Sequence, residues 1–163
     1  MRSGKLALVS VCMMIGASLA ASAQMIRTPL PNGIKFPISL AVEVPAGTST
    51  IYLSGIGPDP LPGTHQYGDT EAQVQSALTK ISGVLQGLGL SLGDVVDVHV
   101  YLAADGNKGD KLDFAGLQAA WTKYFGTKAQ PALPSRSAFQ VAALANPNWL
   151  VEIEVIAARP PKT

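Results

Sequence analysis

The chain has 163 residues, a length that suits one domain with a real hydrophobic core. Its 12 Lys and Arg against 11 Asp and Glu leave no basic surplus to neutralise phosphates, which argues against a nucleic-acid-binding protein. Cys12 is the single cysteine, so an internal disulfide and a cysteine-based zinc site are excluded.

Residues 1–23 are predicted to be a secretory signal peptide. Two basic residues precede an uncharged apolar run at 6–20, and Ala-Ser-Ala at 21–23 fits a cleavage site. An uncleaved anchor helix is the alternative, but the run is shorter than the roughly 18–20 residues of a span. A lipoprotein signal at Cys12 lacks the required small residue before it.

Cleavage after Ala23 would place the mature chain in the periplasm or outside the cell. It would remove the only cysteine and change the net charge from +1 to −1, since 10 basic residues would face 11 acidic ones. Nothing after residue 23 is long and apolar enough to predict a membrane segment.

An irregular leader is expected at 24–36, where two prolines and an Asn-Gly pair interrupt any periodicity. Residues 39–44 alternate weakly and residues 49–54 are β-branched and aromatic. We therefore expect two strands joined by the turn at 45–48 as a hairpin. A loop rich in Gly and Pro follows at 55–67.

Two amphipathic helices are predicted from apolar residues at helical spacing. The first covers residues 70–88, with Asp69 or Thr70 as its N-cap. The second begins after Asp113 and closes at Gly126.

Residues 95–102 form the clearest alternating strand, with aliphatic side chains on one face and Asp97, His99 and Tyr101 on the other. The whole order reads β-β-α-β-α-β-β, which predicts a two-layer α+β domain with both helices on one face of a single sheet. The other face is neither core-like nor fully polar, and such a face is often buried against another subunit.

The candidate site lies in the last two strands, which we expect to be adjacent, at 134–141 and 150–157. They place Arg136, Glu152 and Glu154 in segments that otherwise resemble core. An ionised group in such a place needs a partner or a ligand. A fixed guanidinium can bind a carboxylate through two parallel hydrogen bonds, and the alternative is a structural salt bridge to Glu152 or an aspartate.

Six stretches, kept in order from about residue 37 to residue 158, resemble the RidA (YjgF) family of enamine/imine deaminases. They are Tyr52-Leu53-Ser54-Gly55, Gly68-Asp69, residues 92–102, Tyr124-Phe125-Gly126, Pro134-Ser135-Arg136-Ser137 and residues 151–157. The resulting boundaries are a signal peptide at 1–23, a leader segment at 24–36 and a RidA-like domain at 37–163.

The resemblance implies a chorismate-mutase-like fold and a homotrimer whose sheets form a central barrel with ligand clefts between subunits. In active members a cleft arginine binds the carboxylate of 2-aminoacrylate or a related imino acid, and this role matches Arg136. A glutamate on the last strand places the hydrolytic water, which matches Glu152, whereas Glu154 is expected to be structural. Backbone groups at Ala138 would also contact the ligand.

Ser54 and Gly55 end the second strand, and a glycine there suits a close backbone approach to the ligand. Ile38 stands where many members have a tyrosine, and Ile56 where many have a glutamine. Both changes replace polar groups of the cleft by aliphatic ones, which favours a bulkier or more apolar substrate.

Imine hydrolysis suits this small set of groups, because a protonated imine is already electrophilic and its water needs placement more than a strong base. His65 and His99 lie in no nucleophile motif and lack metal-ligand spacing, so neither a metal site nor a cofactor is expected.

Two functions stay open. One is an exported trimeric deaminase that converts carboxylate-bearing imines into 2-oxo acids and ammonia. The other is a non-catalytic trimer that binds small carboxylates or protects proteins through the same clefts. Ribonuclease activity, also attached to the family, is disfavoured because the chain has no basic stripe.

Overall fold

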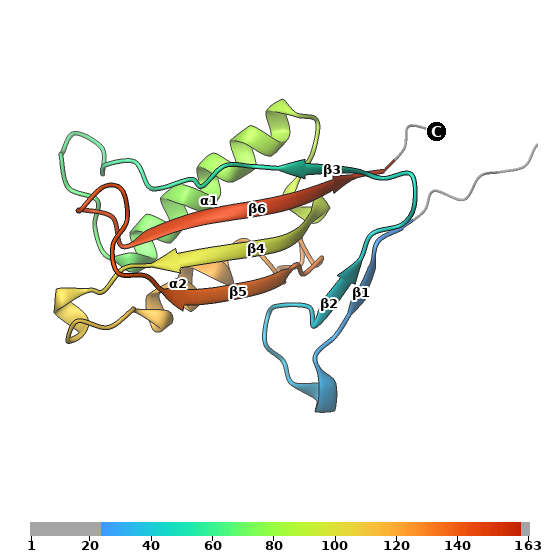
Figure 1. The fold of residues 1–163 in the computed structure, drawn as a ribbon, viewed down its shortest axis with the longest axis horizontal. Helices are drawn as coiled ribbons and strands as arrows, with labels where there is room; N and C mark the ends of the chain where they lie inside the picture. Colours follow the sequence, from blue (N-terminus) through green and yellow to red (C-terminus); the bar gives the residue numbers. More distant parts are fainter. Residues whose placement is uncertain (1–23, 161–163) are drawn as a thin grey trace, which may run out of the picture.

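The computed structural model describes residues 24–160 of the chain (Figure 1). The predicted signal peptide at 1–23 therefore lies outside the described residues. The helices and strands are β1 (Ile26–Thr28), β2 (Ala41–Glu43), β3 (Ser49–Tyr52), α1 (Thr70–Gly87), β4 (Val95–Leu102), α2 (Phe114–Trp121), β5 (Ser135–Gln140) and β6 (Val151–Arg159). The predicted order is confirmed, with β1 added in front of it.

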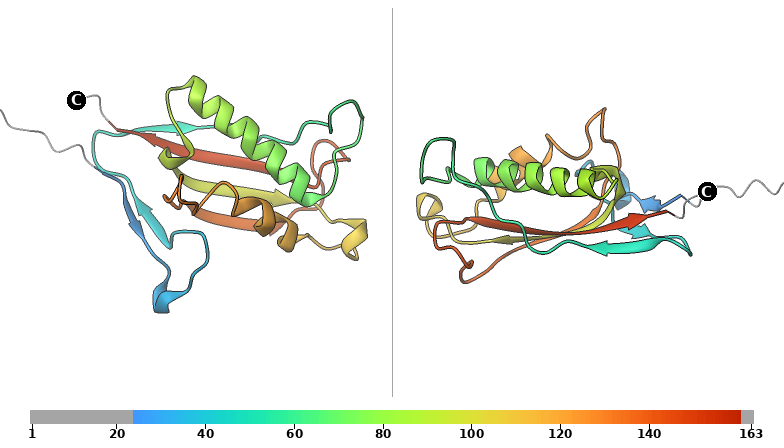
Figure 2. Two further views of the ribbon diagram at one scale, coloured as in Figure 1. Left: turned by 180° about the vertical axis from the view of Figure 1, so that it is seen from behind. Right: turned by 90° about the horizontal axis from the view of Figure 1, so that it is seen from above.

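Four strands form the main sheet in the order β3-β6-β4-β5. β6 is antiparallel to both of its neighbours, and β5 runs parallel to β4. Both helices cover one face of this sheet, as the view from above shows (Figure 2). The two-layer α+β prediction is therefore confirmed.

The two central strands show why one face is core. On β4, Val98, Val100 and Leu102 are fully buried beneath the helices, and on β6 Val151 and Ile153 are too. The alternate residues are half-buried on the sheet face away from the helices. This second face, here called the open face, carries Asp97, His99, Tyr101, Glu152 and Glu154, as predicted.

Both helices begin at the expected caps. The Asp69 side chain accepts a hydrogen bond from the Ala72 amide at 2.9 Å, and Asp113 accepts one from the Gly116 amide at 3.0 Å. The α-helical part of α2 ends at Trp121, earlier than predicted, because amides 123 and 124 bond to carbonyls three residues back. The remaining turns reach Gly126, whose φ is +73°.

The predicted hairpin of 39–44 with 49–54 is wrong. β2 pairs with β1 instead, with Ile26 opposite Glu43, and β3 pairs with β6. β1 lies within the segment expected to be an irregular leader. The β1–β2 ribbon, here called the arm, diverges from the main sheet (Figure 1).

Arg27 connects the arm to the rest of the domain through hydrogen bonds. Its guanidinium donates hydrogen bonds to the carbonyls of Leu133, Gly93 and Val95 at 2.6, 2.8 and 3.0 Å. Burial lowers the pKa of Arg27, and the charge of Asp94 partly opposes this shift. Arg27 on β1 therefore attaches the β1–β2 pair to residues far away in the sequence, and a local sequence pattern does not predict these contacts.

The expected adjacency of the last two strands is also wrong, because β4 lies between β5 and β6. The chain passes from β4 through α2 to β5, and a crossover of this kind places the second strand parallel to the first. Arg136 and Glu152 consequently do not share a strand pair. No helix within residues 24–160 is both long and apolar enough to cross a membrane.

Candidate functional site

Arg136 lies on β5 directly beside Val98 of β4, so its side chain extends to the face that the helices cover. Its Nη2 donates a hydrogen bond to Oε1 of Gln118 on α2 at 2.6 Å. Its Nη1 is buried and has no hydrogen-bond partner among residues 24–160. The guanidinium is therefore positioned by α2 but retains donors for a further acceptor.

Aromatic rings surround this guanidinium. Its Cζ lies 4.4 Å from the ring centre of Trp121, 5.4 Å from that of Phe36 and 5.8 Å from that of Phe114. Burial lowers the pKa of Arg136 to about 10, so the side chain is still a cation at neutral pH. No carboxylate within residues 24–160 forms an ion pair with it, so the alternative of a structural salt bridge to Glu152 or an aspartate is not formed within one chain.

Glu152 lies on the open face of β6, beside Tyr101 of β4. The extended segment after β3 crosses this carboxylate, and a Cβ added at Gly55 would overlap Glu152 Oε1. Reciprocal backbone hydrogen bonds between Ile56 and Ile153, of 2.9 and 3.1 Å, fix the segment there. Gly55 is thus needed for a close approach, although the group approached in this chain is the Glu152 side chain.

The predicted site residues divide into two groups. Arg136 and Ala138 lie on the helix-covered side of the edge strand β5, and Ile38 lies beside Phe36, a wall of the Arg136 environment. Ser54 is exposed and Gly55 is half-buried. Both lie near Glu152, which is on β6, across β4 from β5, and faces the open side of the sheet. One chain therefore holds a cation and a carboxylate on opposite faces of its sheet.

Ile38 reaches its position through two contacts of the segment that precedes β2. The indole Nε1 of Trp121 donates a hydrogen bond to the Pro37 carbonyl at 2.8 Å, and the Ser39 amide donates one to the Pro134 carbonyl at 2.8 Å. The segment therefore runs beside the start of β5. Ile38 and Ala138 both pack against the core as partly buried side chains.

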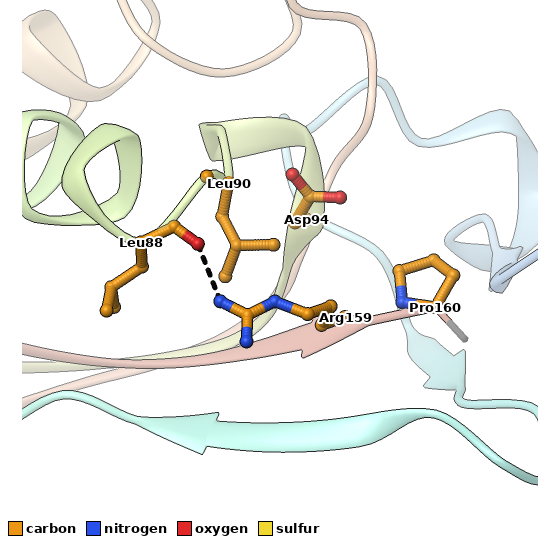
Figure 3. Close-up of a pocket in the computed structure, with 6 residues that line it drawn as sticks. Leu88, Leu90, Asp94, Arg159 and Pro160 are labelled. Atoms are coloured by element: carbon orange, nitrogen blue, oxygen red, sulfur yellow. Dashed lines mark hydrogen bonds between the residues drawn. The ribbon is translucent and has the colours of Figure 1, made fainter. Parts of the chain in front are cut away.

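A separate cavity of about 450 Å³ lies at the far end of β6 (Figure 3). Arg159 in this cavity donates a hydrogen bond to the Leu88 carbonyl at 2.6 Å, at the end of α1. A cation there stabilises the carboxyl end of the helix. Arg159 is seven residues from Glu152 along an extended strand, or about 23 Å, so this cavity is distinct from the candidate site.

Polar side chains on the open face form a network across three strands. The Tyr101 hydroxyl donates to Glu154 Oε2 at 2.6 Å, and this hydrogen bond, with burial, raises the pKa of Tyr101. His99 Nε2 lies 3.2 Å from Asp97 Oδ2, and the Ser135 hydroxyl donates to Asp97 Oδ1 at 2.7 Å. Glu154 thus accepts a hydrogen bond between β4 and β6, and its structural role stays a prediction. Residues 24–160 bring no three His, Cys, Asp or Glu side chains together as metal ligands.

Residues 31–159 match the family model described as Endoribonuclease L-PSP. A 2-iminobutanoate/2-iminopropanoate deaminase of Capra hircus is 38% identical over 128 residues, which cover 78% of this chain and 83% of that protein. The chain belongs to the RidA (YjgF) family. 3-Aminoacrylate deaminase RutC of Acinetobacter baylyi is 30% identical over 129 residues, covering 78% and 94% of the two chains.

Solved structures of the RidA family share the fold. The crystal structure of E. coli TdcF with bound serine matches with a TM-score of 0.56 and 30% identity, covering 82% of this chain and 94% of that one. The serine in TdcF shows that a family member binds a small amino acid.

Sequence reasoning missed the groups that surround Arg136 in this RidA-family chain. Phe36 falls within the predicted leader at 24–36, and Phe114 and Trp121 fall within the second predicted helix, whose apolar spacing indicates packing alone. Gln118 was not singled out, although a signal existed. It lies four residues after Phe114 and three before Trp121, so it is a polar residue on the apolar face of α2.

Proposed function

We propose that this protein hydrolyses enamine and imine intermediates of the 2-aminoacrylate type, giving 2-oxo acids and ammonia. The observation that carries the proposal is Arg136, a half-buried cation whose buried Nη1 has no hydrogen-bond partner and which has no carboxylate partner within residues 24–160. An anionic ligand would supply the acceptor that Nη1 lacks. The relatives named as imine and aminoacrylate deaminases support the same chemistry.

In the proposed mechanism Arg136 binds the substrate carboxylate and so fixes the imine carbon. Glu152 orients the attacking water and stabilises the positive charge of the protonated imine. Water adds to the imine carbon, and the carbinolamine then loses ammonia to leave the 2-oxo acid. Ser54, Gly55 and Ala138 contribute backbone contacts, and Ile38 contributes an apolar wall.

Because Arg136 and Glu152 lie on opposite faces of one sheet, the proposed catalytic site requires two copies of the chain. We therefore infer a homotrimer with clefts between subunits, in which Arg136 of one copy meets Glu152 of another. Two features support this assembly: β5 is an edge strand, and Tyr52 on β3 is 75% exposed.

We also propose that the protein works in the periplasm or outside the cell. The basic, apolar and small-residue pattern of residues 1–23 supports export. Amino-terminal sequencing of the protein recovered from its natural host is expected to begin at Gln24, and a start at Met1 would contradict export with cleavage.

To test this function, the purified chain from residue 24 is mixed with imino acids that an amino-acid oxidase generates in place. The release of ammonia is then measured. Wild type is expected to accelerate release over buffer, and Arg136→Ala to lose that acceleration. Equal release of ammonia with wild type, with Arg136→Ala and with buffer alone would contradict the proposed deaminase activity.

The second candidate is a non-catalytic small-carboxylate binder. It is favoured by the fact that one chain holds Arg136 without Glu152 beside it. Binding of a 2-oxo acid by wild type but not by Arg136→Ala, with no hydrolysis by either protein, would identify this function.

A further inference from the structure

The carboxylate-binding arginine lies beside a parallel aromatic pair. Phe36 and Phe114 are stacked with ring centres 6.3 Å apart and ring planes 5° apart, and both rings lie within 6 Å of the Arg136 guanidinium. Phe114 is 42% exposed, and Phe36 is half-buried. Apolar surface beside the arginine is therefore available to a ligand.

A largely apolar cavity of about 270 Å³ adjoins Phe36 of this pair. Its apolar walls come from Leu30, Ile34, Phe36, Ile38 and Leu133, and Arg27, Lys35 and Ser39 add polar groups. Phe36 belongs both to the cavity and to the aromatic pair over Arg136. It is also the one ring of the three around Arg136 that lies outside a helix, on the segment between the arm strands.

We propose that Phe36, Phe114 and Ile38 form the pocket for the carbon side chain of the substrate, and that this protein prefers 2-imino acids with large apolar side chains. This inference rests on the proposed function. A carboxylate bound to Arg136 places the adjoining carbon chain next to Phe36 and Phe114, and a longer chain would extend past Phe36 towards Ile38 in the cavity. A methyl or ethyl group would leave the phenyl rings in contact with water, whereas a leucine-type or phenylalanine-type side chain would cover them.

The proposed substrates have larger side chains than the imino acids in the relatives' names. The names 2-iminopropanoate and 2-iminobutanoate denote imino acids with methyl and ethyl side chains. One methylene in an apolar pocket changes specificity by about tenfold or more. The isobutyl and benzyl groups of the leucine and phenylalanine imines are correspondingly better matched to a wall of two phenyl rings and an isoleucine.

The experiment measures kcat/KM for imino acids formed in place from alanine, 2-aminobutanoate, leucine and phenylalanine. We expect the leucine and phenylalanine imines to exceed the alanine imine by at least about tenfold. Phe36→Ala is expected to reduce this ratio by about tenfold, and Phe36→Leu, which keeps apolar bulk, to preserve most of it. Val84→Ala, at an exposed apolar site on α1, is the matched control and should leave the ratio unchanged.

Calorimetry with pyruvate and 4-methyl-2-oxopentanoate separates this inference from the proposed function. Tighter, Arg136-dependent binding of the longer acid without any imine hydrolysis would support the pocket and reject the deaminase. Two results would contradict the proposed pocket but support the deaminase activity. One is a higher kcat/KM for the alanine imine than for the larger imines, and the other is an equal loss of kcat/KM for all four imines in Phe36→Ala. Neither binding nor hydrolysis would reject both.

Discussion

At the scale of single residues, ligand binding depends on the charge of Arg136. Partial burial among three aromatic rings lowers its pKa to about 10, because desolvation disfavours the charged form. The side chain nevertheless stays protonated up to about pH 9. A partly buried cation without a counter-charge has an unfavourable desolvation energy, which a carboxylate ligand would offset.

The pH dependence of ligand binding follows from this pKa. Only protonated Arg136 binds the anion, so its contribution to 2-oxo acid affinity should be constant from about pH 7 to 9. Above a pKa of about 10, affinity should fall by about tenfold per pH unit. Calorimetric titration across pH 7–11 tests this, with melting curves to show that the protein remains folded; a steep loss between pH 7 and 9 would point to another group.

Gly55 gives a steric prediction at the same scale. A methyl group at this position would overlap Glu152 Oε1, so Gly55→Ala should displace the carboxylate and reduce imine hydrolysis by about a hundredfold. The matched control is Gly83→Ala, at an exposed helical position where an added Cβ meets nothing within 4 Å. That control should keep full activity and gain up to about 1 kcal/mol in the free energy of unfolding. Full activity of Gly55→Ala would show that Glu152 is not involved.

At the scale of secondary-structure elements, Arg27 holds the arm to the domain through three carbonyl groups. Arg27→Ala should lower the free energy of unfolding by about 2 kcal/mol, because charge-assisted hydrogen bonds are lost. Hydrogen exchange should accelerate at β1 and β2 more than in β4. Lys35→Ala, an exposed cation on the same segment, is the control and should change neither quantity.

The long elements were predictable because their periodicity is strong. The eight residues of β4 alternate cleanly, and the apolar spacing and N-cap of α1 fix its position within a residue. β1 and β2 have three residues each, too few for a pattern to select a pairing partner. The parallel direction of β5 relative to β4 could have been predicted from the β4–α2–β5 crossover. Its place beside β4 could not, because β3 and β4 are joined through α1 in the same way and have β6 between them.

The candidate site was predictable only in part. A cation within a strand identified Arg136, but the rings around it come from distant parts of the chain: Phe36 is 100 residues away in sequence. Such contacts follow from tertiary packing, and no local pattern encodes them. The opposite faces of Arg136 and Glu152 follow from the register of the strands, which pairs Arg136 with Val98 and Glu152 with Tyr101.

At the scale of the whole molecule, the helices cover one face of the main sheet and leave the open face without a covering layer. Tyr52 is 75% exposed there, beside Ile156 of β6. We expect sedimentation equilibrium to give three times the mass of one chain, and Tyr52→Glu to shift the protein towards the monomer by burying an unpaired charge in the interface. Val84→Glu, on the helical side, should remain trimeric. A monomeric wild type at micromolar concentration would contradict the assembly.

The central claim is that Arg136 of one copy and Glu152 of another form one catalytic site. Arg136→Ala and Glu152→Gln should each be inactive alone. When the two variants are unfolded together in equal amounts and refolded as mixed trimers, about a quarter of the sites should combine an intact Arg136 with an intact Glu152. We therefore expect recovery of about a quarter of wild-type imine hydrolysis. No recovery, under conditions in which refolded wild type regains its activity, would contradict it.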